Sequence, residues 1–575
     1  MHRIYEFGDF RLDAARRLLL GSDGLPLPLT PKAFDTLLYL VEHSEAVLDK
    51  EVLMKAIWPD TIVEENNLNQ NISVLRRVLG GDRHEHRYIL TVPGRGYRFV
   101  ASIRTHTAPQ ASSSLASAGT IAVLPFKPVV KENRDASLEI GMADTLIARL
   151  SCIQQIVVRP LSSVRKYADL EQDPLVAGRE LAVESVLEGS LQRRGDKIRV
   201  TVRLVNVSNG SSLWAGTFDE RFTDIFALQD AISERVVSGL AVQLTREDKT
   251  RLAKRYTENT EAYQLYLKGR YYWWKTSPEE FRKSRDYFHQ AVNTDPSYAL
   301  GYCGLNSYYG FASAWGILPP EQGWPKAEWA INKALELDTS LAEAHLGLAA
   351  FKMVYQRDWK GAENEAKRGI ELNPQFDEIH YFYSFYLLVM GRFEEALAEC
   401  RRALACDPFS IRINQHLGST LYYASRYDEA IRQYQQTIEL EPNNHSAHQF
   451  LGDAYEQNGM YSDAIEEWHR AMTLANDGEL AAILKSGYAE PGFSNAVQAV
   501  ALKTIERLND RAQKGEYVPA IHFARAYVRL DEKDQAIRWL IQSCEERNVY
   551  ALMIARDPLY NILRTDPRFI RLRLP

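Results

Sequence analysis

At 575 residues the chain is too long for one hydrophobic core, and at about 100–200 residues per domain its length predicts three to five units. Its hydrophobic (45 %) and charged (25 %) fractions are ordinary for globular protein. The net charge of −6 at pH 7 excludes a global basic field, so any nucleic-acid signal must be local.

No segment is typical of a secreted or membrane-spanning protein. The first ten residues lack the apolar core of a signal peptide, and Ile379–Met390, the best apolar candidate, is too short to cross a bilayer. Five dispersed cysteines form no CxxC pair, which fits free thiols in a reducing compartment and gives no support to a metal site. We therefore expect a cytoplasmic protein without a membrane anchor.

The first 104 residues predict a domain of short strands, three helices and a closing hairpin. Residues 5–29 alternate short apolar segments with turns. Thr30-Pro31 is a helix start, with Thr as the cap and Pro at the first helical position. The predicted helices span residues 30–42, 49–58 and 64–79, and the hairpin spans residues 87–103.

The third predicted helix, Glu64–Leu79, has two unlike faces. One is a narrow apolar stripe with the spacing i, i+4, i+7, i+11, formed by Leu68, Ile72, Leu75 and Leu79. The other is rich in Asn, Gln and Arg, which pair with base edges in a major groove, although taken alone it also fits a solvated helix face. The candidate DNA contacts here are Asn66, Asn67, Gln70, Asn71, Ser73, Val74, Arg76 and Arg77.

Local charge agrees with this interpretation. From Arg76 to Arg104 there are seven arginines and two acidic residues, a net charge of +5, which suits contacts with phosphates. Arg95 lies at the predicted hairpin tip, where it could enter a minor groove or simply satisfy the turn.

Residues 4–103 resemble the winged-helix output domain of OmpR/PhoB-type response regulators and CadC-type activators. The resemblance rests on LTPKAFDTLLYLVEHSEAVLDKEVL, IWPD, NNLNQNISVLRRVLG and ILTVPGRGYRFVA. It implies that Glu64–Leu79 is the recognition helix and that Arg95 is the wing contact. It also implies that Trp58 and Arg76 lie near phosphates and that Tyr97 anchors the wing. The chain lacks a phosphorylatable receiver domain, which argues against phosphorelay control.

Residues 105–119 are Ala/Ser-rich and predict a flexible linker before a middle domain at residues 120–246. Strand-length Ile121–Phe126, the period-two alternation of Lys197–Val207 and the turn at Asn209-Gly210 predict an α/β fold. IAVLPF and VLEGSLQRRGDKIRVTVRLVNVSNGSSLWAGTFD resemble the TolB-like N-terminal domain, which implies a fold but no activity.

Residues 260–575 contain an internal repeat of 34 residues, marked by Pro374, Pro408 and Pro442. Each unit has a small residue at its eighth position, namely Ser384, Gly418 and Gly452, and alanine at its twentieth. This is the tetratricopeptide pattern of paired helices. Less regular units at 262–297, 299–339 and 340–375 precede it, and another pair is expected at 519–547.

The inner helices of such an array could present side chains to a protein or peptide partner, since concave repeat surfaces bind partners. The aromatic runs Tyr271–Trp274 and Tyr381–Tyr386 could line a ligand groove, but aromatic residues at helical spacing more often belong to the repeat core. The candidate partner contacts are Tyr381, Phe385, Gln415, Tyr422, Gln449, Asp453 and Glu456.

Together the patterns predict a multidomain α+β chain: a winged helix, a TolB-like α/β domain and an all-α tetratricopeptide solenoid. No nucleotide-binding, metalloprotease or hydrolase signature occurs, so we expect neither enzymatic activity nor a cofactor. The favoured function is a sequence-specific transcription regulator that binds double-stranded DNA. Its array would receive a protein signal, RNA polymerase being one candidate, and the chain could form a homo-oligomer on DNA. The alternative is a non-enzymatic scaffold whose winged helix binds protein.

Overall fold

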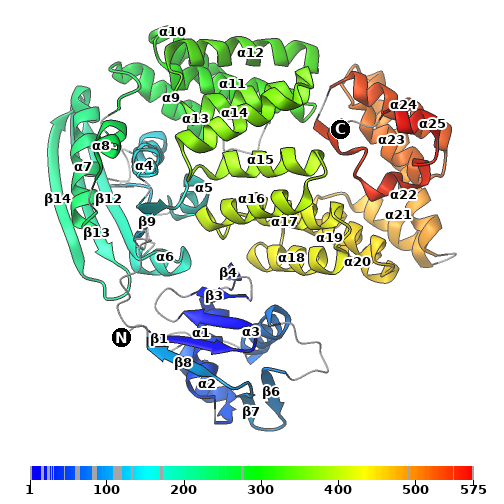
Figure 1. The fold of residues 1–575 in the computed structure, drawn as a ribbon, viewed down its shortest axis with the longest axis horizontal. Helices are drawn as coiled ribbons and strands as arrows, with labels where there is room; N and C mark the ends of the chain where they lie inside the picture. Colours follow the sequence, from blue (N-terminus) through cyan, green and yellow to red (C-terminus); the bar gives the residue numbers. More distant parts are fainter. Residues whose placement is uncertain are drawn as a thin grey trace.

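The computed structural model contains three units in chain order: a winged helix, a mixed α/β domain and a helical repeat region (Figure 1). These units agree with the predicted architecture. The described residues are 3–13, 18–21, 26–27, 29, 31–44, 46–58, 65–79, 87–107, 119–130, 134–153, 155–168, 173–242, 244–252, 254–273, 278–489, 492–547 and 549–572.

The winged helix begins with a sheet of order β4-β3-β2-β1-β8, whose adjacent strands are antiparallel. Its strands are β1 (Arg3–Phe7), β2 (Phe10–Asp13), β3 (Leu18–Leu20), β4 (Pro26–Leu27) and β8 (Arg104–Thr107). β8 carries this sheet three residues into the segment predicted as a linker. Residues 108–118 of that segment lie outside the described residues.

Three helices and a second sheet complete this unit. The helices are α1 (Pro31–Glu42), α2 (Lys50–Ile57) and α3 (Glu65–Val78), close to the predicted boundaries. The second sheet has the order β5-β7-β6, from β5 (Leu48–Asp49), β6 (Ile89–Val92) and β7 (Gly96–Phe99). Leu37 of α1, Leu53 of α2 and Leu75 of α3 are fully buried in one core, which holds the helices at fixed angles.

The middle domain is built on a sheet of order β11-β9-β12-β13-β14. The strands β11 (Ile156–Val158), β9 (Gly119–Val123) and β12 (Ser185–Arg194) run parallel. β12, β13 (Lys197–Asn206) and β14 (Ser212–Arg221) form an antiparallel meander, and short β10 (Lys127–Pro128) pairs with β12. The sheet is mixed because α-helical crossovers join only its parallel strands.

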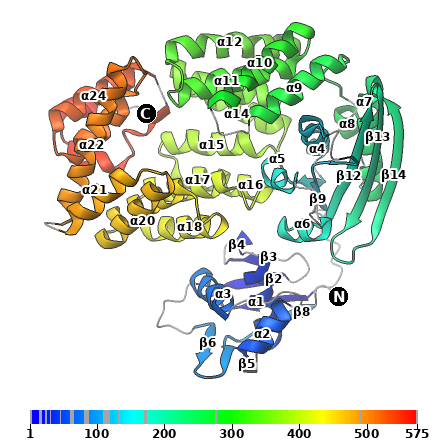
Figure 2. The same cartoon turned by 180° about the vertical axis from the view of Figure 1, so that it is seen from behind.

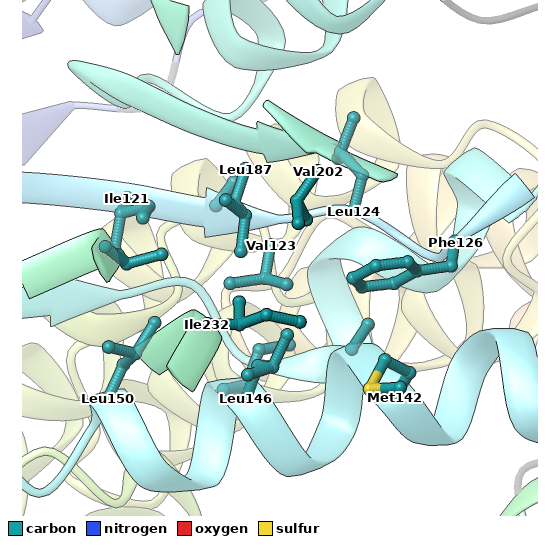
Figure 3. Close-up of a cluster of buried hydrophobic side chains, with 14 of the residues drawn as sticks. Ile121, Val123, Leu124, Phe126, Met142, Leu146, Leu150, Leu187, Val202 and Ile232 are labelled. Carbon is teal, nitrogen blue, oxygen red and sulfur yellow. The ribbon is translucent and has the colours of Figure 1, made fainter. Parts of the chain in front are cut away.

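Two helices, α4 (Ala136–Leu150) and α7 (Ile225–Gly239), pack against this sheet. Figure 3 shows Val123, Leu187 and Val202 pointing from the strands toward Leu146 of α4 and Ile232 of α7. Along β13, Ile198, Val200, Val202 and Leu204 are buried, as the period-two pattern predicts. The shorter helices are α5 (Leu161–Val164), α6 (Pro174–Glu180) and α8 (Arg246–Leu252).

The described repeat region contains eight consecutive helix pairs. They are α9 (Thr260–Trp273) with α10 (Pro278–Thr294), α11 (Ala299–Ala314) with α12 (Pro320–Leu337), α13 (Ala342–Phe351) with α14 (Trp359–Leu372), α15 (Asp377–Val389) with α16 (Phe393–Cys406), α17 (Ile411–Tyr423) with α18 (Tyr427–Leu440), α19 (His445–Gln457) with α20 (Tyr461–Leu474), α21 (Gly478–Ala489) with α22 (Phe493–Gln513), and α23 (Ala520–Arg529) with α24 (Lys533–Glu545). The pair α21–α22 was not predicted from the sequence, because it lacks the repeat's marker residues.

In the pairs α17–α18 and α19–α20 the helices approach closely because a ring of the second helix rests on a glycine of the first. A Cβ atom added at Gly418 would lie 2.5 Å from Cε1 of Tyr434, and one at Gly452 would lie 2.5 Å from Cδ1 of Trp468. These are the small and aromatic positions that recur in the sequence with the 34-residue period. The predicted close packing of the paired helices is confirmed at both positions.

The C-terminal segment folds back against the middle of the array, so the repeats curve around a common interior (Figure 1, Figure 2). The Trp315 and Tyr550 rings lie 5.5 Å apart, and Arg556 Nε donates to the Val389 carbonyl at 3.3 Å. A short terminal helix, α25 (Pro567–Arg571), packs with this segment through Phe569. Contacts between distant repeats therefore close the array.

Polar contacts dock the middle domain on the array, two sets of them far apart along the repeats. Near the first repeat, Arg270 of α9 makes two hydrogen bonds to Asp144 of α4, at 3.0 and 3.2 Å. Farther along, buried Arg159 donates to the Cys406 carbonyl at 2.8 Å, and Ser162 donates to Asp407 at 3.0 Å. These buried polar contacts fix the position of the domain against the repeats.

None of the described helices combines the length and the apolar character that crossing a membrane requires.

Replacing Gly418 by valine is expected to destabilise the repeat region by about 1–3 kcal/mol, because the new side chain overpacks the Tyr434 ring. The matched control is Gly478→Val at the start of α21, where no atom lies within 4 Å of an added Cβ. Urea unfolding followed by circular dichroism measures both variants. Equal midpoints for the two variants would contradict this packing account.

Candidate nucleic-acid interface

Helix α3 is held by its apolar stripe and exposes the opposite face. Leu68 and Leu75 are fully buried, and Ile72 and Leu79 are 1 % exposed, so the stripe forms part of the winged-helix core. This anchoring leaves the polar face directed away from the core, with the side-chain spacing that a helix imposes.

The exposed residues of the opposite face are Asn67, Gln70, Ser73 and Arg77, while Val74 is half-buried beside them. We call this set the α3 face. Asn67, Gln70 and Ser73 make no side-chain hydrogen bond to any described residue, so their donors and acceptors are available to a ligand. The side chain of Asn66 lies outside the described part of the structure.

Two other residues predicted to contact DNA, Asn71 and Arg76, form hydrogen bonds within the winged helix. Asn71 donates to Thr36 Oγ1 of α1 at 3.1 Å. Arg76 donates to the Ile89 carbonyl at 2.9 Å and to Thr91 Oγ1 at 2.6 Å, and burial lowers the pKa of its guanidinium. Arg76 therefore braces β6, and its contact with phosphate stays a prediction.

The wing is formed by β6, β7 and the turn between them. Gly94 has a φ of +72°, which favours glycine, and Arg95 N–H donates to the Val92 carbonyl at 3.0 Å. A Cβ at Gly96 would collide with the Leu48 carbonyl, because β5 passes close to β7. The Arg95 side chain is exposed at the tip of this turn.

Tyr97 and Trp58 flank the α3 face in different ways. Tyr97, expected to anchor the wing, is buried on β7, and its hydroxyl donates to Asn69 Oδ1 of α3 at 2.7 Å. Trp58 is half-buried just after α2, with the Lys32 ammonium 5.7 Å from its ring centre. Phosphate contact by Trp58 stays a prediction.

One residue of the α3 face contacts the repeat array. Arg77 forms an ion pair of 2.6 Å with Glu439 of α18, and the winged helix lies below that part of the array in both views (Figure 1, Figure 2). The Glu439 side chain is 15 % exposed, and burial raises its pKa while Arg77 opposes that rise. The repeats and a DNA phosphate would therefore compete for the same guanidinium.

The candidate partner contacts on the array separate into two groups. Those that line a cavity on the inner side of the array are Tyr381, Phe385 and Gln415. Those outside its lining are Tyr422, Gln449, Asp453 and Glu456.

The residues of the second group bond other residues of the array or are buried in it. Asp453 accepts hydrogen bonds from Trp468 Nε1 at 2.9 Å and from Gln449 Nε2 at 3.1 Å. Glu456 pairs with Arg529, whose Nη2 lies 2.7 Å from Oε2. Tyr422 is 8 % exposed. Their contact with a partner stays a prediction.

Sequence reasoning did not find Thr36, Thr91 or Glu439. Their partners on α3 are 35, 15 and 362 residues away in sequence, and no local pattern brings such distant positions together. The aromatic and Gly spacing of PGRGY was a usable signal for the turn, but it says nothing of what α3 contacts.

Three family models match parts of the chain. Residues 24–99 match the family described as transcriptional regulatory protein, C terminal, and residues 116–235 match the second domain of HilA/YgeH-like transcriptional regulators. Residues 354–411 and 417–479 match tetratricopeptide repeats. The predicted OmpR/PhoB-type winged helix and repeats are thus confirmed, whereas the TolB-like assignment of the middle domain stays a prediction.

Similar proteins share different lengths of this chain. Transcriptional regulator HilA of Salmonella typhimurium is 26 % identical over 416 residues, which cover 71 % of each chain. A Rhizobium meliloti protein provisionally named adenylate cyclase 3 is 28 % identical over 232 residues, 40 % of this chain and 39 % of that one. Transcriptional activator CadC of Escherichia coli is 34 % identical over 85 residues, 15 % of this chain and 17 % of CadC. The expected lack of enzymatic activity stays a prediction.

Glu439→Gln is expected to tighten DNA binding by the full chain about 1.5- to 5-fold, because a partly exposed ion pair of this kind contributes about 0.2–1 kcal/mol. The control is Glu466→Gln, which removes an exposed charge from the next repeat without touching Arg77. Fluorescence anisotropy with one DNA duplex at fixed salt measures both. A gain that survives in the Arg77→Ala background would show that the ion pair is not its cause.

Proposed function

We propose that this DNA-binding transcriptional regulator of the HilA, CadC and OmpR type recognises one operator sequence. Helix α3 lies in the major groove, and the wing reaches the adjacent minor groove through Arg95. The observation that supports the proposal most directly is the α3 face, where Asn67, Gln70 and Ser73 are exposed and unbonded to described residues. Side-chain amides and hydroxyls placed in this way can hydrogen-bond base edges.

The surrounding charge suits the same docking. Arg87, Arg95 and Arg98 are exposed on and beside the wing hairpin, and Arg77 ends the α3 face. Phosphate contacts from such residues fix the register of a protein on the duplex, whereas base contacts carry the sequence preference. The proposal therefore divides the interface into a reading part on α3 and a positioning part around it.

The rest of the chain receives the signal in this proposal. The array binds a protein or peptide partner, RNA polymerase being one candidate, and the chain self-associates on DNA. The middle domain has a TolB-like fold and links the two ends, and the regulator acts in the cytoplasm, where genomic DNA lies. Support comes from Tyr381, Phe385 and Gln415, which line the inner cavity of the array.

The scaffold alternative has one observation in its favour. Arg77 already contacts protein, through Glu439 of the array. A winged helix that serves only as a protein-binding module would show no sequence preference and no salt-dependent DNA affinity. The two functions are therefore distinguishable by a single selection experiment.

Selection from a random DNA library with the full chain is expected to enrich one motif. Affinity for that motif should fall steeply with salt, because phosphate contacts release counterions. The chosen sites are retested at two salt concentrations, with a scrambled duplex as the control. No enriched motif and no salt dependence would favour the scaffold.

Substitutions on the α3 face should separate reading from positioning. Gln70→Ala is expected to cost about 1–3 kcal/mol at one base position, and Arg77→Ala to weaken all duplexes alike and lower the salt slope by about one. Val52→Ala, at an exposed uncharged position of α2, is the control. Binding to a panel of single-base variants measures each effect, and identical profiles for Gln70→Ala and wild type would remove α3 as the reading helix.

A further inference from the structure

A cavity of about 1390 Å³ lies between the middle domain and the inner side of the array. Its walls include Asp144 of α4 in the middle domain and three residues of the array, namely Tyr381 of α15, Arg412 of α17 and Arg525 of α23. Segments far apart in the sequence therefore enclose the cavity. Ligand pockets in proteins commonly measure about 300–1,000 Å³. The space is larger than this range, so a small molecule would occupy only part of it.

One part of the lining is an aromatic wall that we define as Trp273, Phe311, Trp315 and Tyr550. Its successive ring centres are 5.5, 5.9 and 5.5 Å apart. Phe311 and Trp315 are 42 % and 44 % exposed, although they line a concave interior. Large apolar side chains left accessible together in this way mark a binding surface.

A cationic group lies beside the wall. The Tyr550 ring lies 5.7 Å from the ring of His522, which stands three residues before Arg525 on α23, and Tyr550 and Arg525 both line the cavity. The Arg525 side chain is 43 % exposed, and its ion pair with Asp557 is one contact of 3.5 Å. By contrast, Arg270, another arginine of the lining, donates two hydrogen bonds to Asp144. Most N–H donors of Arg525 therefore remain available.

Of the Arg525–Asp557 pair, the cavity meets mainly the arginine, because the Asp557 side chain is only 7 % exposed. Arginines outnumber carboxylates eight to five among the described lining residues, but Arg149 and Arg255 already pair with Asp230, which lies outside the lining. The hydroxyl of buried Tyr560, which also lines the cavity, has no hydrogen-bond partner among the described residues. A ligand oxygen could accept from Arg525, whose side chain is exposed in the cavity.

We propose that this cavity binds an amphipathic organic anion, with its acidic group on Arg525 and its aromatic or aliphatic body against Phe311 and Trp315. The aromatic wall supplies apolar area, and the guanidinium supplies charge-assisted hydrogen bonds. Binding does not depend on DNA recognition. Only the role of this ligand as the signal of the regulator rests on the proposed function.

The test uses the full chain and two probes of nearly equal size, 2-naphthoate and uncharged 2-naphthalenemethanol. Isothermal titration calorimetry should show one saturable site for 2-naphthoate and at least tenfold weaker binding of the alcohol. Trp315→Ala should weaken 2-naphthoate at least fivefold. Trp329→Ala, an equally exposed tryptophan outside the cavity lining, should leave its affinity unchanged.

Arg525→Gln tests the charge directly and should weaken 2-naphthoate about tenfold while leaving the alcohol unaffected. The control is Arg538→Gln at an exposed position of α24 outside the cavity lining. If Arg525→Gln unfolds because Asp557 loses its partner, the proposal is still tested in two ways. The wild-type protein must prefer 2-naphthoate to the alcohol, and Trp315→Ala must bind 2-naphthoate more weakly than Trp329→Ala does. Absence of saturable binding, equal affinity for both probes, or equal losses in Trp315→Ala and Trp329→Ala would each overturn the proposal. A failed operator selection would leave these results untouched.

Discussion

The close contact between the two helices of a pair, made in two regular repeats by a ring on a glycine, determines the shape on which the other features depend. At Gly418 and Gly452 the absence of a side chain lets the Tyr434 and Trp468 rings rest on the neighbouring helix. Repetition of this contact with a 34-residue period stacks the pairs into a curved array, because each pair can bury its apolar face only against the next. The curve places the first repeats, the middle domain and the C-terminal segment around one interior. The cavity is a consequence of this closure.

A buried polar interface holds the middle domain at that interior. The guanidinium of Arg159 is enclosed by the carbonyls of Leu181, Ala182 and Cys406, at 2.9, 3.1 and 2.8 Å, and Asp407 lies beside it. Burial lowers the pKa of Arg159 and the charge of Asp407 opposes that effect. A charge so enclosed is costly without partners. Two of its partners, the Cys406 carbonyl and Asp407, belong to the array, so they join Arg159 to the repeats. The geometry of the cavity thus depends on hydrogen bonds as much as on apolar packing.

The winged helix combines a rigid support with an accessible surface. The apolar stripe of α3 and the bonds of Asn71 and Arg76 leave the helix little freedom relative to α1 and β6. Its exposed amides are therefore presented in a fixed arrangement, which lowers the entropic cost of binding. Among the described residues of the α3 face, Arg77 is the one that pairs with the array, through Glu439. This ion pair is weak. The repeats therefore compete with DNA for the positive charge of Arg77, but they do not cover the rest of the α3 face.

Periodicity in the sequence determined the three units, the helices of the winged helix within one or two residues, the alternating β13 and most helix pairs, because burial of apolar side chains repeats along a helix or strand. It also determined which residues of α3 face outward. Only the tertiary structure decided that Asn71 and Arg76 are occupied by Thr36, Ile89 and Thr91, that α21 and α22 form a further pair, and that Arg525 lies beside the aromatic wall. These contacts join residues that are distant in the chain, and local sequence patterns carry no information about contacts between distant residues.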